Sequence, residues 1–178
     1  MQRISTRNIS YFGLLIALNV VLTRIGSIRI GGGGVEIVRI GFGGYPVIFA
    51  GIMFGPLAGG IVGAVGDVIG HFMSPMGPYM PHFTISAALT GILPGFIIML
   101  FRDKEKSKTS FIKLVVAIGI GQIITSVLMT PYFMKILFGI PMITTVPGRV
   151  INQAIHIPLY SYATKILINR LSLILSTN

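Results

Sequence analysis

Long apolar stretches dominate this chain and restrict its fold more than any other feature. The 178 residues have a mean hydropathy of +0.87, and 10% of them are charged, whereas a soluble domain carries about 25%. So few charged residues cannot cover a water-facing surface. A helix needs about 20 apolar residues to cross a bilayer, so the chain has room for about six or seven crossings. The composition predicts an integral membrane protein.

We predict six transmembrane helices in a single all-α transmembrane domain over residues 1–178. The apolar spans are about 9–23, 40–54, 57–73, 84–101, 111–130 and 147–171. Gly55 and Pro56 predict a tight turn between the second and third spans. The apolar run after Arg3 and Arg7 has no clear small-residue cleavage site, so we interpret it as a retained first helix and not as a signal peptide.

The basic residues predict which helix ends face the cytoplasm. The sequence RDKEKSK at 102–108, with Lys113, is the only strongly charged hydrophilic stretch, and it joins the fourth and fifth spans. Positively charged connections favour the cytoplasmic side. Placing this connection inside also places the basic residues near both chain ends inside, which accounts for nine of the fourteen. We therefore expect a multi-pass protein of the cell membrane with both termini in the cytoplasm.

Three connections are then expected on the outer side, at about 24–40, 74–83 and 131–146. The first has an alternating apolar pattern after four glycines, which predicts a small hairpin or a re-entrant cap. The second, SPMGPYMPHF, contains three prolines and is expected to be stiff. The third is amphiphilic and is bounded by prolines. Stiff connections are more typical of a lid that covers a binding site than of an open channel.

Five cations remain on the predicted outer side, where the charge rule does not explain them. They are Arg24, Arg29, Arg39, Lys135 and Arg149. They can extend toward lipid headgroups, or they can form a basic vestibule for an anionic ligand. Arg149 is the strongest candidate, because Arg149, Asn152 and Gln153 share one helix face. A guanidinium and two amides can bind a carboxylate and a planar heterocycle.

Polar residues inside the spans are further candidates. Asp67 and His71 lie four residues apart in the third span, on one helix face. An acid within a membrane is costly and marks a polar interior or a site. The pair can be structural, can accept N–H groups of a heterocycle, or, less readily, can relay protons. Gln122 lies in the middle of the fifth span and needs a polar partner, which a neighbouring helix or a ligand can supply.

Small residues recur at four-residue spacing, which lets helices approach closely. The glycines of the third span are expected to pack inside the protein; they are Gly59, Gly63, Gly66 and Gly70. Gly13 and Ala17 form a similar pair in the first span, whose other residues are bulky. This second pair can face another subunit.

Motifs for catalysis and for cofactor binding are missing from the sequence. There is no P-loop for ATP, no nucleophile elbow and no HExxH pair. Cysteine is absent and the three histidines are scattered, so neither a disulfide nor a metal site is predicted. The net charge of +10 belongs to no basic soluble domain, which argues against nucleic-acid binding. We expect no enzyme activity and no cofactor bound by this chain.

The order and spacing of motifs from about 39 to 153 resemble the S components of energy-coupling factor (ECF) transporters, and more narrowly their folate family. The motifs are Arg39, Phe42–Pro46, Phe54-Gly55-Pro56 with Gly59, Gly66-Asp67, Pro75, Gly77-Pro78-Tyr79, Pro81, Phe83-Thr84, Gly91 with Gly95, and PGRVINQ at 147–153. The resemblance implies six helices and a vitamin bound near the outer face. The connections after the first, third and fifth spans would cover it.

The resemblance also implies partners. The S component would have no ATPase and would dock on a transmembrane coupling subunit, which two cytoplasmic ATPase subunits drive; ATP would be used by those partners. Members of the family dock through a small-xxx-small motif on the first helix. Gly13 and Ala17 occupy that position here, with Gly in place of the usual first Ala. The implied transport cycle is a toppling of the S component in the membrane.

Folate is the substrate that residues and resemblance together favour, because it has a planar pterin and a glutamate tail with two carboxylates. The outer cations, including Arg24, Arg39 and Arg149, suit the tail. The expected pterin partners are Asp67, Gln122, Asn152 and Gln153, with His71 beside Asp67, and the expected stacking rings are Phe42, Tyr79 and Phe83. The alternatives are an S component for pyridoxine or hydroxymethylpyrimidine, and a stand-alone channel or facilitator for small solutes.

Overall fold

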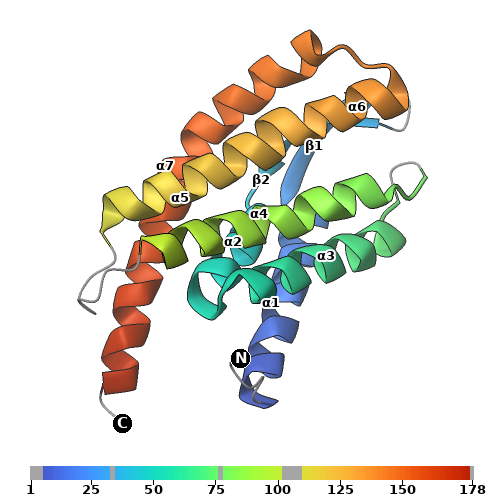
Figure 1. Cartoon of the computed structure of the whole chain (residues 1–178). Helices are drawn as coiled ribbons and strands as arrows, with labels where there is room; N and C mark the ends of the chain where they lie inside the picture. The colour runs from blue at the N-terminus through green and yellow to red at the C-terminus, as the bar shows by residue number, and fades with distance from the viewer. Residues whose placement is uncertain (1–5, 33–34, 76–77, 102–109, 177–178) are drawn as a thin grey trace.

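The computed structural model describes residues 6–32, 35–75, 78–101 and 110–176, most of them in helices (Figure 1). The helices are α1 (Thr6–Arg24), α2 (Gly44–Phe54), α3 (Pro56–Met73), α4 (Pro81–Leu100), α5 (Phe111–Gln122), the π-helix η1 (Ile123–Met129), α6 (Thr130–Phe138) and α7 (Met142–Ser176). The strands are β1 (Ser27–Gly32) and β2 (Val35–Gly41). A helix occurs at each of the six predicted spans, because each apolar run must satisfy its own backbone hydrogen bonds in a bilayer.

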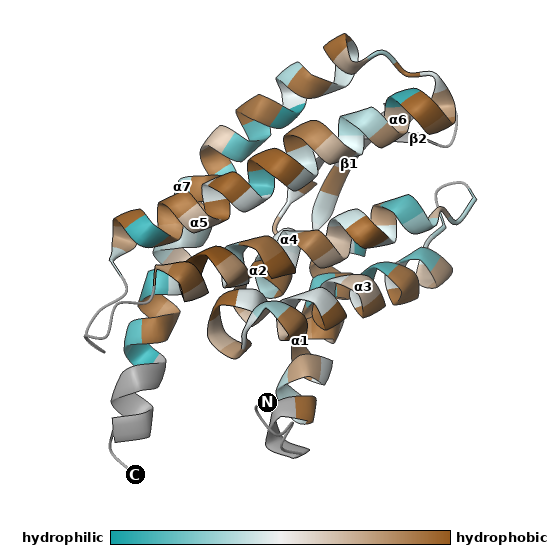
Figure 2. Ribbon diagram, viewed as in Figure 1, coloured by the Kyte–Doolittle hydropathy of each residue, from teal (hydrophilic) through white to brown (hydrophobic). Residues whose placement is uncertain are grey.

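The distribution of side chains is that of a protein surrounded by lipid. Large apolar residues are exposed, including Leu14 at 67% and Ile143 at 80%, whereas polar residues such as Thr125 and Thr145 are buried. Figure 2 shows apolar positions along much of the length of the helices. Among the described residues, α3, α4 and the continuous helix Phe111–Phe138 are long and apolar enough to cross a membrane. Two apolar helices, Ile9–Arg24 and Gly44–Phe54, are shorter.

The prediction of an outer connection at 131–146 is wrong. The helix of the fifth span continues through η1 and α6 to Phe138, and α7 begins at Met142. Gly139 ends α6 in the left-handed conformation, with a φ of 67°, which glycine adopts without steric cost. Because α7 begins before Pro147, Arg149 lies about two turns into that helix and not in its first turn.

The first outer connection is a β-hairpin, which is one of the two forms predicted for it. β1 and β2 are antiparallel, with Ser27 opposite Gly41. Two buried side chains hold the end of the hairpin and the residues that follow it. Asn19 of α1 donates a hydrogen bond to the Gly43 carbonyl at 2.7 Å, and the Tyr160 hydroxyl of α7 donates to the Gly41 carbonyl at 3.1 Å. The hairpin is thus fixed to both α1 and α7 just before α2 begins.

Glycines bring α2, α3 and α4 into close contact. A Cβ atom on Gly59 would lie 2.7 Å from the carbonyl oxygen of Gly91, and one on Gly51 would collide with the same oxygen. Gly63 lies against the carbonyl of Ala87 in the same way. The prediction that the third-span glycines pack inside is confirmed. Gly55, with a φ of 99°, makes the predicted tight turn between α2 and α3.

The connections divide between two ends of the molecule. Figure 1 shows the hairpin and the α3–α4 and α6–α7 connections at one end. The turn between α2 and α3, the start of α1 and the end of α7 lie toward the other end. The charged stretch at 102–108 and Arg3, on which the predicted orientation depends, lie outside the described residues.

Candidate ligand-binding site

A cavity of about 310 Å³ opens among the helices at the end of the molecule that carries the hairpin. Its volume falls in the range of small-molecule sites, roughly 300–1,000 Å³. Its walls come from α1, the residues around the start of α2, α3, the connection between α3 and α4, α4, the end of α5, η1, α6 and α7. The residues that line it are Arg24, Gly41, Gly44, Asp67, His71, Pro78, Tyr79, Met80, Phe83, Ser86, Ala87, Thr90, Gln122, Thr125, Ser126, Thr130, Met134, Phe138, Arg149, Asn152, Gln153, His156 and Tyr160.

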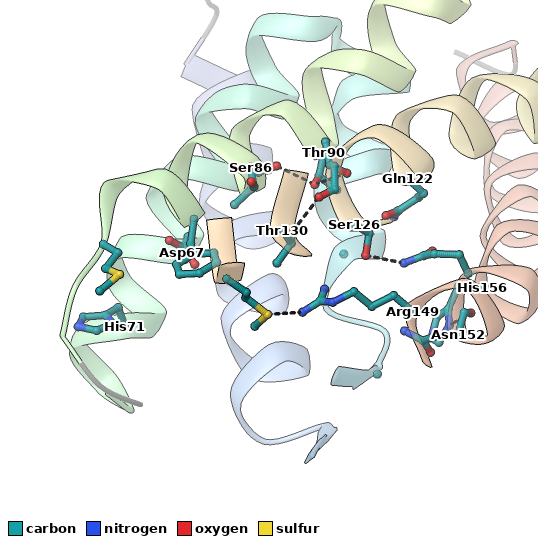
Figure 3. A pocket seen from close by; sticks show the side chains of 18 of the residues that line it. Asp67, His71, Ser86, Thr90, Gln122, Ser126, Thr130, Arg149, Asn152 and His156 are labelled. Atoms are coloured by element: carbon teal, nitrogen blue, oxygen red, sulfur yellow. Dashed lines mark hydrogen bonds between the residues drawn. The ribbon is translucent and has the colours of Figure 1, made fainter. Parts of the chain in front are cut away.

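An acidic and aromatic wall faces the cavity from α3, from α4 and from the connection between them. Asp67 and His71 project from α3, and Figure 3 places them on one side of the cavity. The Tyr79 ring lies 5.3 Å from the His71 ring, with an interplanar angle of 62°. Phe83 stacks against Phe138 of α6, with centroids 6.4 Å apart. This wall offers a carboxylate beside flat apolar surfaces, which suits a planar ring with N–H groups.

A basic and amide-rich wall faces the cavity from α7. Arg149, Asn152 and Gln153 all line it, as expected from their shared helix face. Arg149 is only 9% exposed, and its guanidinium lies 3.7 Å from the Met134 sulfur. In Figure 3, Arg149 and Asn152 lie across the cavity from Asp67 and His71. His156 continues this wall, with Nδ1 2.7 Å from the Asn152 carbonyl oxygen. The cavity thus has an acid on one side and a guanidinium on the other.

Hydroxyl and amide groups lie between these two walls. Thr90 Oγ1 of α4 lies 3.2 Å from Thr125 Oγ1, and Gln153 donates to Ser126 Oγ at 2.8 Å. Ser86 and Gln153 are 6% and 7% exposed. Within the described structure, Ser86 Oγ and Gln153 Oε1 are buried and have no hydrogen-bond partner. Buried polar atoms are rarely left in this state, so both are available to a ligand.

The π-helix η1 supplies part of this polar region. Thr125 and Ser126 line the cavity from it. Thr130 donates through both its backbone N–H and its hydroxyl to the Thr125 carbonyl, the side-chain bond being 2.8 Å long. Pro131 follows and has no N–H to continue the regular ladder. Wide turns of this kind are frequent at functional sites, and here the turn carries two hydroxyl residues into the cavity.

Nine of the eleven predicted ligand-binding residues line this cavity. They are Arg24, Asp67, His71, Tyr79, Phe83, Gln122, Arg149, Asn152 and Gln153. Phe42 is not among the lining residues described; its ring packs 5.7 Å from that of His156, which does line the cavity. Arg39 lies in β2 opposite Arg29, but its side chain is outside the described structure, so its role stays a prediction. Lys135 is exposed on α6 and is not among the lining residues.

Several lining residues escaped the sequence reasoning, which looked for charges, amides and aromatic rings. They include the hydroxyl residues Ser86, Thr90, Thr125 and Ser126. A spacing signal was present, because Ser86 and Thr90 lie four residues apart in an apolar span, as do Gln122 and Ser126. His156 and Tyr160 repeat that spacing in α7. Polar residues at i and i+4 within apolar spans are therefore the pattern that would have found these residues, with the exception of Thr125.

Gly13 and Ala17 lie far from this polar interior, on an exposed face of α1. A Cβ atom on Gly13 would have no neighbour within 4 Å. Packing within the described structure therefore does not require a glycine at position 13. Leu14 and Leu18 on the same helix are also exposed, at 67% and 42%.

Comparisons with known proteins agree with one another on the family. The sequence profile of the family described as "ECF-type riboflavin transporter, S component" matches residues 3–169. The folate transporter FolT of Clostridium novyi (strain NT) is 36% identical over 151 residues, which cover 85% of this chain and 81% of that protein.

Solved structures also match along nearly the full length. A crystal structure of FolT bound with folic acid has a TM-score of 0.76 at 27% identity, covering 93% of this chain and 95% of that one. The structure of the S component of a bacterial ECF transporter has a TM-score of 0.64 at 22% identity, covering 95% and 97%, and supports the fold alone. These matches are to transport proteins and not to enzymes. The resemblance found in the sequence is therefore confirmed, and this integral membrane protein belongs to the S components of ECF-type transporters.

Proposed function

We propose that this protein is the folate-binding subunit of an ECF-type transporter, which captures folate at the outer face for ATP-driven uptake. One observation carries the choice of substrate: the buried guanidinium of Arg149 lies across the cavity from the Asp67 carboxylate. Folate matches both, because it has a ring edge with N–H donors and a tail with carboxylates. The relationship to a folate transporter and to a FolT structure with folic acid supports the same choice.

The charge on Arg149 distinguishes folate from riboflavin, after which the matching family is named. Charges in a buried site interact far more strongly than charges in water, and a guanidinium can hold a carboxylate through two parallel hydrogen bonds. Riboflavin carries no carboxylate, and its ribityl chain is neutral. Pyridoxine and hydroxymethylpyrimidine lack a carboxylate as well. A cavity with a 9%-exposed arginine therefore suits folate best among these ligands.

The pterin is proposed to lie near Asp67, between the rings of Tyr79 and Phe83. An ionised carboxylate accepts N–H groups and donates none. Gln122, Ser86 and the Oε1 atom of Gln153 supply further polar contacts to the ring. The glutamate tail would extend toward Arg149, with Asn152 beside it. Arg24 and His71 complete the proposed contacts.

We propose a single transmembrane domain with six crossings and both termini in the cytoplasm. The cavity lies near the hairpin, at the end of the molecule away from the start of α1 and the end of α7 (Figure 1). The sequence carries nine basic residues in or beside segments assigned to the cytoplasm. This orientation opens the cavity to the outside. Helices as short as α2 are tolerated where neighbours shield them.

The partners follow from membership in the family. The chain has no P-loop, so ATP would be hydrolysed by two partner ATPases that act through a transmembrane coupling subunit. We propose that the exposed face of α1 around Gly13 and Ala17 docks on that subunit. Small residues at four-residue spacing allow two helix backbones to approach, and the open space beside Gly13 leaves room for such an approach. No catalytic role is proposed for this chain.

Calorimetric titration of the detergent-purified protein tests the substrate. We expect binding heat with folic acid and none with riboflavin, pyridoxine or hydroxymethylpyrimidine at the same concentrations. Absence of heat with folic acid would contradict the proposal. Heat with riboflavin alone would favour the substrate named in the family description. A stand-alone channel is tested by flux of folic acid into vesicles that contain only this chain, where we expect none.

A further inference from the structure

Thr84 lies at the outer end of the glycine seam between α3 and α4. Along this seam Gly59 meets Gly91, Gly63 meets Ala87, and Asp67 meets Thr84. The steps are four residues on α3, and four and three on α4, which keep each set on one face of its helix. Because the backbones of α3 and α4 lie this close, the short side chain of Thr84 can reach the carboxylate of Asp67. Thr84 Oγ1 donates to Asp67 Oδ2 at 2.8 Å.

The same hydroxyl also contacts Tyr79. The two hydroxyl oxygens lie 2.9 Å apart. A threonine hydroxyl has one hydrogen, and here that hydrogen is donated to Asp67. The Tyr79 hydroxyl must therefore donate to Thr84, so the hydrogen bonds run in one direction, from Tyr79 through Thr84 to Asp67. Both ends of this chain, Tyr79 and Asp67, line the cavity.

The direction of these bonds determines what this wall offers a ligand. The hydroxyl hydrogen of Tyr79 is donated to Thr84, so the Tyr79 oxygen can act toward a ligand only as an acceptor. Asp67, when ionised, is also an acceptor only. Oδ2 holds the Thr84 hydrogen, and within the described structure no other hydrogen bond reaches this carboxylate. The wall therefore presents two acceptors and excludes a ligand edge that has no N–H or O–H to donate.

We propose that Thr84 is a positioning residue that determines ligand specificity. It orients the Asp67 carboxylate and fixes the Tyr79 hydroxyl as an acceptor, so the cavity selects a heterocycle with adjacent N–H donors, such as an amino group beside a ring N–H. This inference rests on the proposed folate function, and it names a residue that does not itself line the cavity. Removal of the Thr84 hydroxyl frees both partners to rotate, and the preference for a donor edge falls.

The test compares Thr84→Val with Thr84→Ser, using two ligands and calorimetry on the detergent-purified protein. The ligands are folic acid and 2-desamino-2-methylfolic acid, which keeps the tail but has a methyl group in place of the amino donor. We expect Thr84→Val to weaken folic acid about tenfold and the desamino analogue less than about threefold. Thr84→Ser, which keeps the hydroxyl, should stay near wild type with both.

Tyr79→Phe supplies a second measurement. If the hydrogen bonds form one chain, Tyr79→Phe should weaken folic acid in the wild-type background and add little in the Thr84→Val background. An equal loss of both ligands in Thr84→Val would show that Thr84 only supports the fold, and would overturn the inference while the proposed function stands. Equal behaviour of Thr84→Val and Thr84→Ser would overturn it as well. A wild-type protein that binds no folic acid would overturn the proposed function and this inference together.

Discussion

Arg149 is the most buried of the outer cations whose side chains are described. Arg24 is half-buried and donates to the Ser74 carbonyl at 3.1 Å, and Lys135 is exposed. The sequence placed Arg149 on one helix face with Asn152 and Gln153, and the structure keeps that face toward the cavity. A guanidinium in this position gives directional recognition, since its planar fork matches a carboxylate.

Replacement of Arg149 tests the proposed tail contact. Arg149→Ala should weaken folic acid by roughly 10–100-fold, the range expected for a hydrogen bond to a charged group. It should change binding of a neutral pterin without the glutamate tail by less than about threefold, because that ligand has no carboxylate to lose. Calorimetric titrations of both ligands measure the difference. Lys135→Ala is the matched control, since Lys135 is an exposed cation outside the cavity lining, and both affinities should stay unchanged. Equal losses for the two ligands in Arg149→Ala would show that Arg149 does not hold the tail.

At the scale of the elements, apolar runs predicted where helices lie, but not where they end. The connection predicted at 131–146 was bounded by prolines, but the helix continues through Pro131 to Phe138. The π-helix before it already widens the turn, so the missing N–H of Pro131 is accommodated and α6 continues. A π-helix does not change the pattern of apolar residues along the sequence, so that pattern could not predict it. The glycine seam was predictable, because its spacing is local and its consequence is close packing.

Alanine substitution in the seam tests how closely the helices must approach. Gly59→Ala should lower the thermal unfolding midpoint in detergent by roughly 2–10 °C, since overpacking costs about 1–3 kcal/mol. The new Cβ atom would lie 2.7 Å from the Gly91 carbonyl oxygen and 2.7 Å from the Gly51 Cα atom. Gly13→Ala is the matched control, because its Cβ has no neighbour within 4 Å and alanine favours a helix over glycine by about 1 kcal/mol. Its midpoint should stay the same or rise. If Gly59→Ala matched the control, the seam would be looser than the structure shows.

At the scale of the whole molecule, the site forms because distant spans contribute to one end. Asp67 and Arg149 are separated by more than 80 positions, and no local pattern states that they face one cavity. The sequence indicated both residues as candidates, because an acid within an apolar span is costly and because the charge rule does not explain an arginine on the outer side. Their distance and the hydroxyl groups between them depend on the crossing of α3, α4, η1 and α7, which tertiary packing decides. The cavity opens among these helices, whereas the exposed face of α1 with Gly13 and Ala17 has no part in its lining.

This separation predicts that binding and transport can be uncoupled. Gly13→Leu or Ala17→Leu should leave the affinity for folic acid in detergent unchanged, because neither residue lines the cavity. Uptake of folic acid into vesicles reconstituted with the coupling subunit and both ATPases should fall about tenfold, since bulk inserted into a close helix contact costs roughly 1–3 kcal/mol. Ala154→Leu is the matched control, because Ala154 is exposed on α7, and uptake should continue. A loss of affinity in the α1 variants would mean that α1 supports the cavity. Unchanged uptake would place the docking surface elsewhere, since a leucine at Gly13 would fill the space into which a partner helix must fit.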